Sequence, residues 1–343
     1  GEQHPDVAKT QSNMASVLER QGELSQAMEL DEKALAIQIP CLGEQHPDVA
    51  VTYSTMAIVR ERQGEYVQAM ALHEKTLAIQ ILTSGEQHPN VAKTYYRMAF
   101  VLQRLGDYCR AMGFHEKALA IQIPVLGEQH PDVAKTYGNM ANVLKEQGEL
   151  DRAMELQEKA LAVRIRALGE QHPDVAKTQS NMASVLERQG ELSQAMELDE
   201  KALAIQIPCL GEQHPDVAVT YSTMAIVRER QGEYVQAMAL HEKTLAIQIL
   251  TSGEQHPNVA KTYYRMAFVL QRLGDYCRAM GFHEKALAIQ IPVLGEQHPD
   301  VAKTYGNMAN VLKEQGELDR AMELQEKALA VRIRALGEQH PDV

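Results

Sequence analysis

Cysteine is scarce in this sequence. Its 343 residues include four cysteines, which lie far apart in the chain, and no pair has the C-x-x-C spacing of a metal or redox motif. The four are Cys41, Cys109, Cys209 and Cys277. A disulfide framework requires closely organised pairs in an oxidising compartment, so this pattern predicts a reducing, cytoplasmic location.

Long apolar runs and catalytic motifs are also missing. No run approaches the ~20 residues of a membrane-spanning helix, and no stretch resembles a signal peptide, so we expect no membrane partner. The sequence lacks both the G-x-S-x-G nucleophile motif and a phosphate-binding loop. Carboxylates such as Glu19, Glu29 and Glu32 are spaced as solvated helix faces. We therefore expect no enzyme activity and no cofactor.

Positive charge is in deficit, because 34 lysines and arginines face 46 acidic residues and the net charge is −12. This balance argues against a nucleic-acid partner. Of the 13 histidines, most recur once per repeat, which places neighbouring rings too far apart to share an ion with ~2 Å bonds. His73 and His115 have no histidine four residues away, so we assign them a structural or surface role and expect no metal site.

What the sequence does contain is a repeat of 42 residues. Eight copies follow one another without a gap, and residues 169–343 repeat residues 1–175 letter for letter. The copies span residues 1–42, 43–84, 85–126, 127–168, 169–210, 211–252, 253–294 and 295–336, with a partial ninth at 337–343. A fixed period of this size is typical of a solenoid, in which each repeat buries its apolar surface against its neighbours. The sequence therefore predicts a single solenoid domain over residues 1–343.

The apolar spacing predicts two helices per repeat. The first helix begins at Pro5, because proline has no amide hydrogen to lose in the first turn, and it ends at Gly22. His4 and its copies are predicted to be linker and capping residues. Ala15 and Ala27 are small enough to let two antiparallel helices approach closely, so each repeat is predicted to be a helical hairpin.

The second helix begins near Leu24 and is predicted to end at Pro40 and Gly43, because proline and glycine both interrupt helices. Leu82 and Arg166 replace this proline in the second and fourth repeats. We expect the second helix to run longer there.

Each repeat carries variants of the pattern H-P-D-V-A-x-T-x-x-N-M-A…Q-G-E-L…A-M…E-K-A-L-A-I…L-G-E-Q-H-P. This pattern resembles the 42-residue tetratricopeptide repeat of kinesin light chains. The resemblance covers the whole chain and implies an all-α fold, a right-handed superhelical solenoid of antiparallel helix hairpins. It also implies a scaffold that binds peptide or protein segments in a concave groove lined by the first helix of each repeat.

By this resemblance, positions 9, 12, 13, 16 and 20 of each repeat face the groove. The third repeat is the only one of the four distinct repeats with a positive net charge, +2, and it offers aromatic residues at these positions. Tyrosine and arginine are frequent at binding hot spots, and guanidinium groups bind carboxylates in pairs of hydrogen bonds. The candidate residues are Lys93, Tyr96, Arg97, Phe100, Arg104, Lys135, Asn139 and Asn142, with copies Lys261, Tyr264, Arg265, Phe268, Arg272, Lys303, Asn307 and Asn310.

These residues predict two sites per chain for an acidic or aromatic peptide. The alternative is that Phe100 packs under the next helix and the arginines are only solvated. Some relatives bind a peptide C-terminus through a carboxylate clamp, and Lys93, Arg97 and Asn139 match part of it. Serine or threonine stands where the clamp needs lysine and asparagine in the preceding repeats, so the clamp is incomplete.

The two extremities of the array resemble its interior, whereas solenoids normally end in polar capping elements. The last second helix exposes Leu329 and Ile333, and the first helix lacks a preceding repeat. Each extremity is therefore shaped to fit the other, which predicts head-to-tail association into a filament. An assembly role without a dedicated ligand is the alternative function. The missing initiating methionine and the exact duplication favour a natural fragment or an engineered array.

Overall fold

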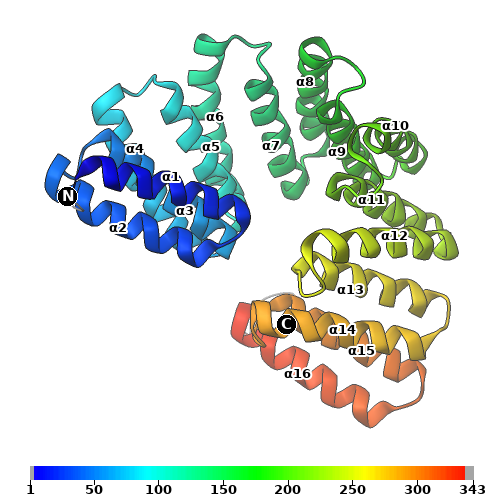
Figure 1. Ribbon diagram of the computed structural model, residues 1–343. Helices are drawn as coiled ribbons and strands as arrows, with labels where there is room; N and C mark the ends of the chain where they lie inside the picture. The colour runs from blue at the N-terminus through cyan, green and yellow to red at the C-terminus, as the bar shows by residue number, and fades with distance from the viewer. Residues whose placement is uncertain (1–3, 337–343) are drawn as a thin grey trace. The chain divides into compact units, whose positions relative to one another are not determined.

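A computed structural model describes residues 4–336, and its regular secondary structure is entirely helical (Figure 1). Sixteen α-helices and no strand lie in these residues, which confirms the predicted all-α class with two helices per repeat. The first four repeats hold α1 (Pro5–Gln21), α2 (Leu24–Leu42), α3 (Pro47–Gln63), α4 (Tyr66–Ser84), α5 (Pro89–Arg104), α6 (Tyr108–Leu126), α7 (Pro131–Gln147) and α8 (Leu150–Leu168). The next four hold α9 (Pro173–Gln189), α10 (Leu192–Leu210), α11 (Pro215–Gln231), α12 (Tyr234–Ser252), α13 (Pro257–Arg272), α14 (Tyr276–Leu294), α15 (Pro299–Glu314) and α16 (Leu318–Leu336).

The chain divides into two compact bodies, Gly1–Gly169 and Glu170–Val343, and each contains four hairpins. Within each body, the second helix of one hairpin packs against the first helix of the next. That the eight repeats form one continuous solenoid over residues 1–343 stays a prediction. The partial ninth repeat, 337–343, lies outside the described residues.

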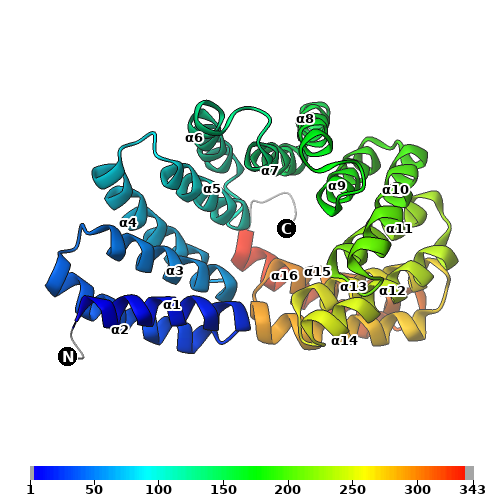
Figure 2. The same cartoon turned by 45° about the horizontal axis from the view of Figure 1, so that its top comes forward.

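The odd-numbered helices form the inner layer of the first body. Figure 2 shows α3, α5 and α7 on the inner side of its curve, with α4, α6 and α8 outside. Helix α1 also contacts α3, and α5 contacts α7, as expected of helices on the shorter, inner side of a curved stack. The same contacts join α9 to α11 and α13 to α15 in the second body. None of the described helices combines the length and the hydropathy needed to cross a bilayer.

A histidine caps the start of every odd-numbered helix. The ring Nδ1 of His4 accepts a hydrogen bond from the backbone amide of Asp6 at 3.2 Å, and the seven described copies do the same at 3.1–3.2 Å. This bond satisfies one of the amides that a helix start leaves without an internal partner. The predicted capping role is confirmed. Gly22 ends α1 with a φ of 87°, a conformation that side chains other than hydrogen strongly disfavour.

The predicted end of the second helix at Pro40 is wrong. Helix α2 continues through Pro40 to Leu42, and α4, which has leucine at the equivalent position, has the same length of 19 residues. Proline so close to the helix end removes only one backbone hydrogen bond. Gly43 ends the helix instead, and its amide donates to the carbonyl of Ile39 at 3.0 Å.

The core lies between the two layers and continues from hairpin to hairpin. Ala15 and Ala27 are fully buried where the two helices of the first hairpin meet, as predicted. They belong to one apolar cluster with Met28 of α2 and with Met56 and Val59 of α3. Consecutive hairpins therefore share one apolar core, as expected of a solenoid.

Candidate functional site

Three of the predicted groove residues meet across a repeat boundary. In the first body, Asn139 of α7 donates a hydrogen bond through Nδ2 to the hydroxyl of Tyr96 on α5 at 2.8 Å. The ammonium of Lys135 lies 5.0 Å from the centroid of the Tyr96 ring. A cation at this distance is attracted to the face of the ring. The side chain of Tyr96 is half-buried, so it forms the floor on which the lysine and the asparagine lie.

The second body repeats this arrangement. Asn307 donates to the Tyr264 hydroxyl at 2.7 Å, and the Lys303 ammonium lies 5.5 Å from the ring centroid. Burial raises the pKa of Tyr264, and the hydrogen bond from Asn307 acts in the opposite direction. The tyrosine thus stays neutral at physiological pH and supplies an uncharged surface beneath the lysine.

A buried carboxylate holds the predicted arginine of the third repeat. Nη1 of Arg97 lies 3.4 Å from Oε2 of Glu61, whose other oxygen lies 2.6 Å from Nε2 of His73. The side chains of Glu61 and His73 are 5% and 1% exposed, whereas that of Arg97 is 43% exposed. Arg97 therefore bridges the buried interior and the groove, and its guanidinium group is only partly neutralised from below.

The copies of these residues have nearly the same geometry. Arg265 lies 3.3 Å from Glu229, and Glu229 lies 2.6 Å from His241. In the sixth repeat, Arg230 also pairs with a buried carboxylate, that of Glu187 in the preceding repeat, at 2.5 Å. Both arginine–glutamate pairs link two adjacent repeats, so ion pairs between neighbouring repeats lie along the floor of the groove.

The arginine at position 20 of the third repeat, Arg104, has a different partner from its copy in the second body, Arg272. In the first body, the guanidinium carbon of Arg104 lies 5.3 Å from the ring centroid of Phe100, which is half-buried. In the second body, Nε of Arg272 donates to the hydroxyl of Tyr234 at 3.0 Å, and the Phe268 side chain is 36% exposed. The sequence is identical in both places, so this arginine has two available partners.

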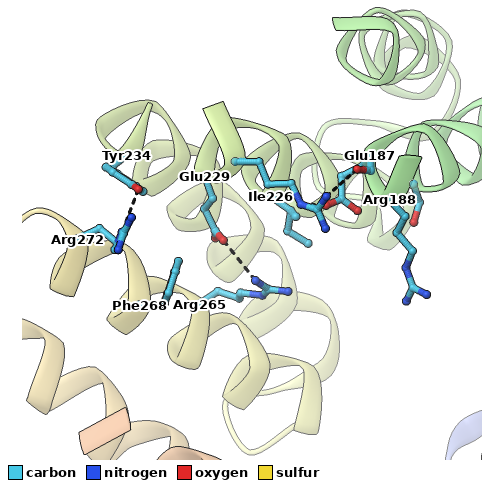
Figure 3. Close-up of a pocket in the computed structure, with 10 residues that line it drawn as sticks. Glu187, Arg188, Ile226, Glu229, Tyr234, Arg265, Phe268 and Arg272 are labelled. Atoms are coloured by element: carbon cyan, nitrogen blue, oxygen red, sulfur yellow. Dashed lines mark hydrogen bonds and ion pairs between the residues drawn. The ribbon is translucent and has the colours of Figure 1, made fainter. Parts of the chain in front are cut away.

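The second body has a pocket of about 590 Å³ at these residues (Figure 3). Four arginines, two glutamates and three larger apolar or aromatic side chains surround it, on helices α9, α11, α12 and α13. Its lining consists of Ser184, Glu187, Arg188, Ile226, Glu229, Arg230, Tyr234, Arg265, Phe268 and Arg272. A neighbouring pocket of about 330 Å³ shares Arg265 and Phe268 and extends to Lys261, Tyr264 and Lys303. These two residues therefore form the wall between two adjoining hollows.

Two sequence predictions are wrong, one about the groove and one about a solvated helix face. Ser12 does not face it: the side chain is buried and donates to Asp31 at 2.8 Å, between the two helices of the hairpin. Glu19 is not on a solvated face but 7% exposed, and it pairs with Arg62 at 2.6 Å. Both positions lie at the border between the groove and the contact with the neighbouring helix. Helical spacing alone does not show whether a residue there is exposed to the groove or buried in the contact.

The remaining candidates lie on the same inner helices with different degrees of exposure. Lys93 and Lys261 are exposed, and Lys261 lines the smaller pocket. Asn142 is half-buried, whereas its copy Asn310 is exposed and lines neither pocket.

The residues that the sequence analysis missed are Glu61, Tyr66 and their copies. Ile58 and its copy Ile226 occupy position 16, which was predicted to face the groove. One available signal was polarity: positions 19 and 31 of the repeat are polar in all four distinct repeats, although they lie among apolar neighbours. Position 31 is occupied by Asp31, His73, His115 and Gln157, all of them fully buried. A polar residue fixed at a buried position requires a partner, and that partner is here the neighbouring position 19 or 12.

Burial also controls the charge of His115, which occupies position 31 of the third repeat. His115 lies under the Tyr96 ring with centroids 5.8 Å apart, and its Nε2 is 3.1 Å from the side-chain amide of Gln103. Burial lowers the pKa of His115 to about 4. It is neutral at physiological pH, so the positive charge of the groove comes from its arginines and lysines.

The family model described as tetratricopeptide repeat matches this chain at residues 6–82, 90–166, 132–207, 174–249, 216–291 and 258–334. A solved structure of TPR-like repeats of the kinesin light chain type from Podosopora anserina, which are nearly identical to one another, is similar to this chain. Its sequence is 26% identical to this chain, and the TM-score is 0.51 over 60% of this chain and 98% of that one. BtubC (BKLC) from P. vanneervenii is 24% identical, with a TM-score of 0.53 over 76% of this chain and 94% of its own.

The apo form of the quorum sensor NprR from B. thuringiensis is 15% identical and has a TM-score of 0.72, over 95% of this chain and 88% of that one. At 24% and 15% identity, BtubC and NprR support the fold and nothing more specific. No curated protein matches the chain.

Proposed function

The chain belongs to the tetratricopeptide repeat family, and from that premise we propose that each body binds an acidic peptide carrying an aromatic side chain along its odd-numbered helices. Repeats of this family generally serve as protein-interaction scaffolds without enzyme activity, and they bind protein or peptide partners. The proposed contacts are those of the third repeat, from Lys93 to Arg104, with Lys135 and Asn139 of the fourth, and the copies of these residues in the second body.

The charge of the larger pocket carries this proposal. Its lining contains four arginines and two glutamates, so it is locally positive on a chain whose net charge is −12. Both glutamates already pair with arginines of the next repeat, through Arg230 and Arg265. An acidic ligand would complement the surplus of positive charge, and Phe268 and Ile226 would contact its apolar side chains.

A peptide array tests this proposal. Immobilised peptides that pair glutamate or aspartate with phenylalanine, tyrosine or tryptophan are expected to retain the chain at low salt and less at high salt. Combined replacement Arg97→Ala and Arg265→Ala is expected to raise Kd about tenfold or more, because a charge-assisted hydrogen bond is lost. Equal affinity after these replacements would count against the groove.

The matched control lies in the same repeat. Arg110 and Arg278 are on the outer helices α6 and α14, where they pair with the exposed or half-buried Asp107 and Asp275. Replacing these two arginines with alanine changes the net charge by the same amount. Unchanged peptide affinity in this control is expected, and an equal loss would indicate nonspecific attraction to positive charge.

A second candidate function is assembly, favoured by exposed apolar side chains on α1 and α16. On α1, Met14 and Val17 are 52% and 56% exposed. At the same positions of α3, Met56 and Val59 are 8% and 0% exposed because the preceding hairpin covers them. Helix α1 therefore presents the surface that a preceding hairpin buries inside the body.

Helix α16 presents the complementary surface. Leu318 and Met322 are 64% and 62% exposed, whereas Met238, at the position equivalent to Met322, is 8% exposed. We propose that α16 of one copy covers α1 of a second copy, in the way that α2 packs on α3. Such a head-to-tail contact produces a filament unless its rotation closes a ring.

Sedimentation velocity at rising concentration measures this association. Met322→Glu is expected to keep the chain monomeric, because it places a charge in the apolar contact. Val235→Glu is the control, since Val235 is 72% exposed on α12, away from the proposed contact. A wild-type chain that stays monomeric at millimolar concentration excludes the assembly role.

The cysteines support a reducing location. All four lie among the described residues, are exposed and form no disulfide. Exposed thiols of this kind persist where glutathione and thioredoxin keep them reduced, so we propose a cytoplasmic protein. Fractionation of cells that express the tagged chain tests this, and recovery from an oxidising compartment would contradict it.

A further inference from the structure

The arginine of Phe-x-x-x-Arg in the third repeat has two resting positions, one in each body. In the first body the guanidinium of Arg104 covers the ring of Phe100, with 5.3 Å between the guanidinium carbon and the ring centroid. In the second body Arg272 is turned to Tyr234, through the 3.0 Å hydrogen bond from Nε to the phenol oxygen. The two segments have the same sequence, so one side chain can occupy either position.

The two positions present different surfaces to a ligand. With Arg272 on Tyr234, the Phe268 ring is 36% exposed. It lines the larger pocket, which Figure 3 shows, and the adjoining pocket of about 330 Å³. With Arg104 over Phe100, that ring is half-buried and its face is occupied by a cation. In the first body a cation therefore covers one face of the phenyl ring, whereas in the second body the equivalent arginine is bonded to the tyrosine.

The tyrosine also determines how the arginine is presented. Its hydroxyl accepts the hydrogen bond from Nε, so this bond does not use the two terminal nitrogens of the guanidinium. These nitrogens are the pair that binds a carboxylate through two parallel hydrogen bonds. By contrast, Arg230 and Arg265 in the same pocket are paired with the carboxylates of Glu187 and Glu229, which offset part of their charge.

We propose that Tyr234, and Tyr66 when Arg104 turns to it as Arg272 turns to Tyr234, are positioning residues of the peptide site: the phenol hydroxyl holds the arginine off the phenylalanine, so that a carboxylate-binding guanidinium and an uncovered ring lie side by side. The inference rests on the proposed peptide-binding function for its biological use. It assigns to the second repeat a role in a site whose ligand contacts come from the third and fourth repeats. The ligand feature that this pair would recognise is a carboxylate next to an aromatic or large apolar side chain.

The chain supplies a matched control for the tyrosine. Tyr108 and Tyr276 occupy the same position one repeat later, at the start of α6 and α14. The residue that would take the place of the arginine there is Glu146 or Glu314. Both kinds of tyrosine are half-buried against the same apolar clusters, so replacement by phenylalanine removes one hydroxyl from a similar environment.

A fluorescence measurement without any ligand tests the arginine's position. The chain has no tryptophan, so Phe268→Trp introduces a single reporter. Adding Tyr234→Phe is expected to lower the acrylamide quenching constant of that tryptophan, because Arg272 then stacks over it. Adding Tyr276→Phe instead is expected to leave the constant unchanged. Adding Arg272→Met to the Tyr234→Phe chain is expected to restore quenching.

Equal quenching in the Tyr234→Phe and Tyr276→Phe chains would overturn the proposal, whether or not a peptide binds. Binding is then measured with a fluorescein-labelled synthetic peptide that carries one phenylalanine flanked by glutamates. Combined Tyr66→Phe and Tyr234→Phe is expected to raise its Kd about three- to tenfold, the usual effect of one hydrogen bond, and the Tyr108→Phe and Tyr276→Phe control is expected to leave it unchanged.

The two experiments distinguish an error in the proposed function from an error in the role assigned to the tyrosine. If no acidic aromatic peptide binds the wild-type chain, the proposed function is wrong, and the fluorescence result still decides the position of the arginine. If the peptide binds with equal affinity to both pairs of tyrosine variants, the groove binds peptides and the tyrosine does not position the site.

Discussion

Replacing two buried aspartates, Asp31 and Asp199, with asparagine is expected to remove most of the pH dependence of the free energy of unfolding between pH 5 and 8. Asp31 is completely buried between the helices of the first hairpin, and one oxygen accepts a hydrogen bond from Ser12 at 2.8 Å. Its other oxygen is buried without a hydrogen-bond partner among the described residues. Asp199 has the same surroundings in the second body, with Ser180 as its donor.

Burial raises the pKa of Asp31 to about 7 and that of Asp199 to about 8, although the serine hydrogen bond lowers both. The folded chain therefore holds a proton that the unfolded chain, with an ordinary aspartate pKa of 3.8, releases earlier. Stability is highest below pH 4 as far as these groups are concerned, and it falls as pH rises until the folded-state pKa is passed. For Asp31, the interval from 3.8 to about 7 corresponds to about 4 kcal/mol.

Urea unfolding at pH 5, 6.5 and 8 measures this effect. The wild-type midpoint is expected to fall with rising pH, and the Asp31→Asn and Asp199→Asn chain is expected to show a much flatter profile, since asparagine keeps the serine hydrogen bond without a charge. Exposed Glu32 and Glu200 provide the control, because Glu→Gln there changes the net charge equally. A wild-type midpoint that does not fall, or identical profiles for the wild type and the asparagine chain, would refute the reasoning.

Two further predictions concern local backbone structure, and both are measured as shifts of the urea midpoint. Gly64→Ala is expected to destabilise by about 1 kcal/mol, because Gly64 has a φ of 79°. Gly113→Ala, inside α6 where an added Cβ meets nothing within 4 Å, is expected to stabilise by about 1 kcal/mol. Shifts of the same sign would contradict this contrast. His130→Ala is expected to cost about 1 kcal/mol by removing a helix cap, whereas His130→Ser keeps a capping oxygen and costs less. Equal losses would show that the capping bond contributes nothing.

The fold was predictable because the same local sequence pattern occurs in all eight repeats. Proline at the first turn, glycine at the turn and alanine at the helix crossing each act within one hairpin, over distances that helical periodicity describes. The tetratricopeptide resemblance is confirmed by the family match. The error at Pro40 has the same origin: sequence shows that a helix will end nearby, but the last turn tolerates one missing hydrogen bond, and Gly43 decides the end.

The candidate site was predictable only in part. Tyr96, Arg97 and Phe100 do lie on an inner helix, as their spacing indicates. However, Asn139 and Glu61, which bind Tyr96 and Arg97, come from other repeats. Glu61 lies 36 residues before Arg97, and the Tyr234 hydroxyl 38 residues before Arg272. Such contacts depend on the offset between stacked hairpins, which a single repeat does not specify. Comparing the repeats with one another would have identified the buried polar positions. It would not have shown which neighbouring residue forms the hydrogen bond with each one.

The central claim is that the inner helices, rather than the outer helices, contact the ligand. NMR spectra of the arginine Nε–Hε groups measure this directly during titration with the glutamate-flanked phenylalanine peptide. The account predicts saturable shifts for Arg265 and Arg272 on α13, with the signal of Arg278 on α14 unchanged. Shifts confined to Arg278, or no shift at Arg265 and Arg272 when the peptide is fully bound, would contradict it.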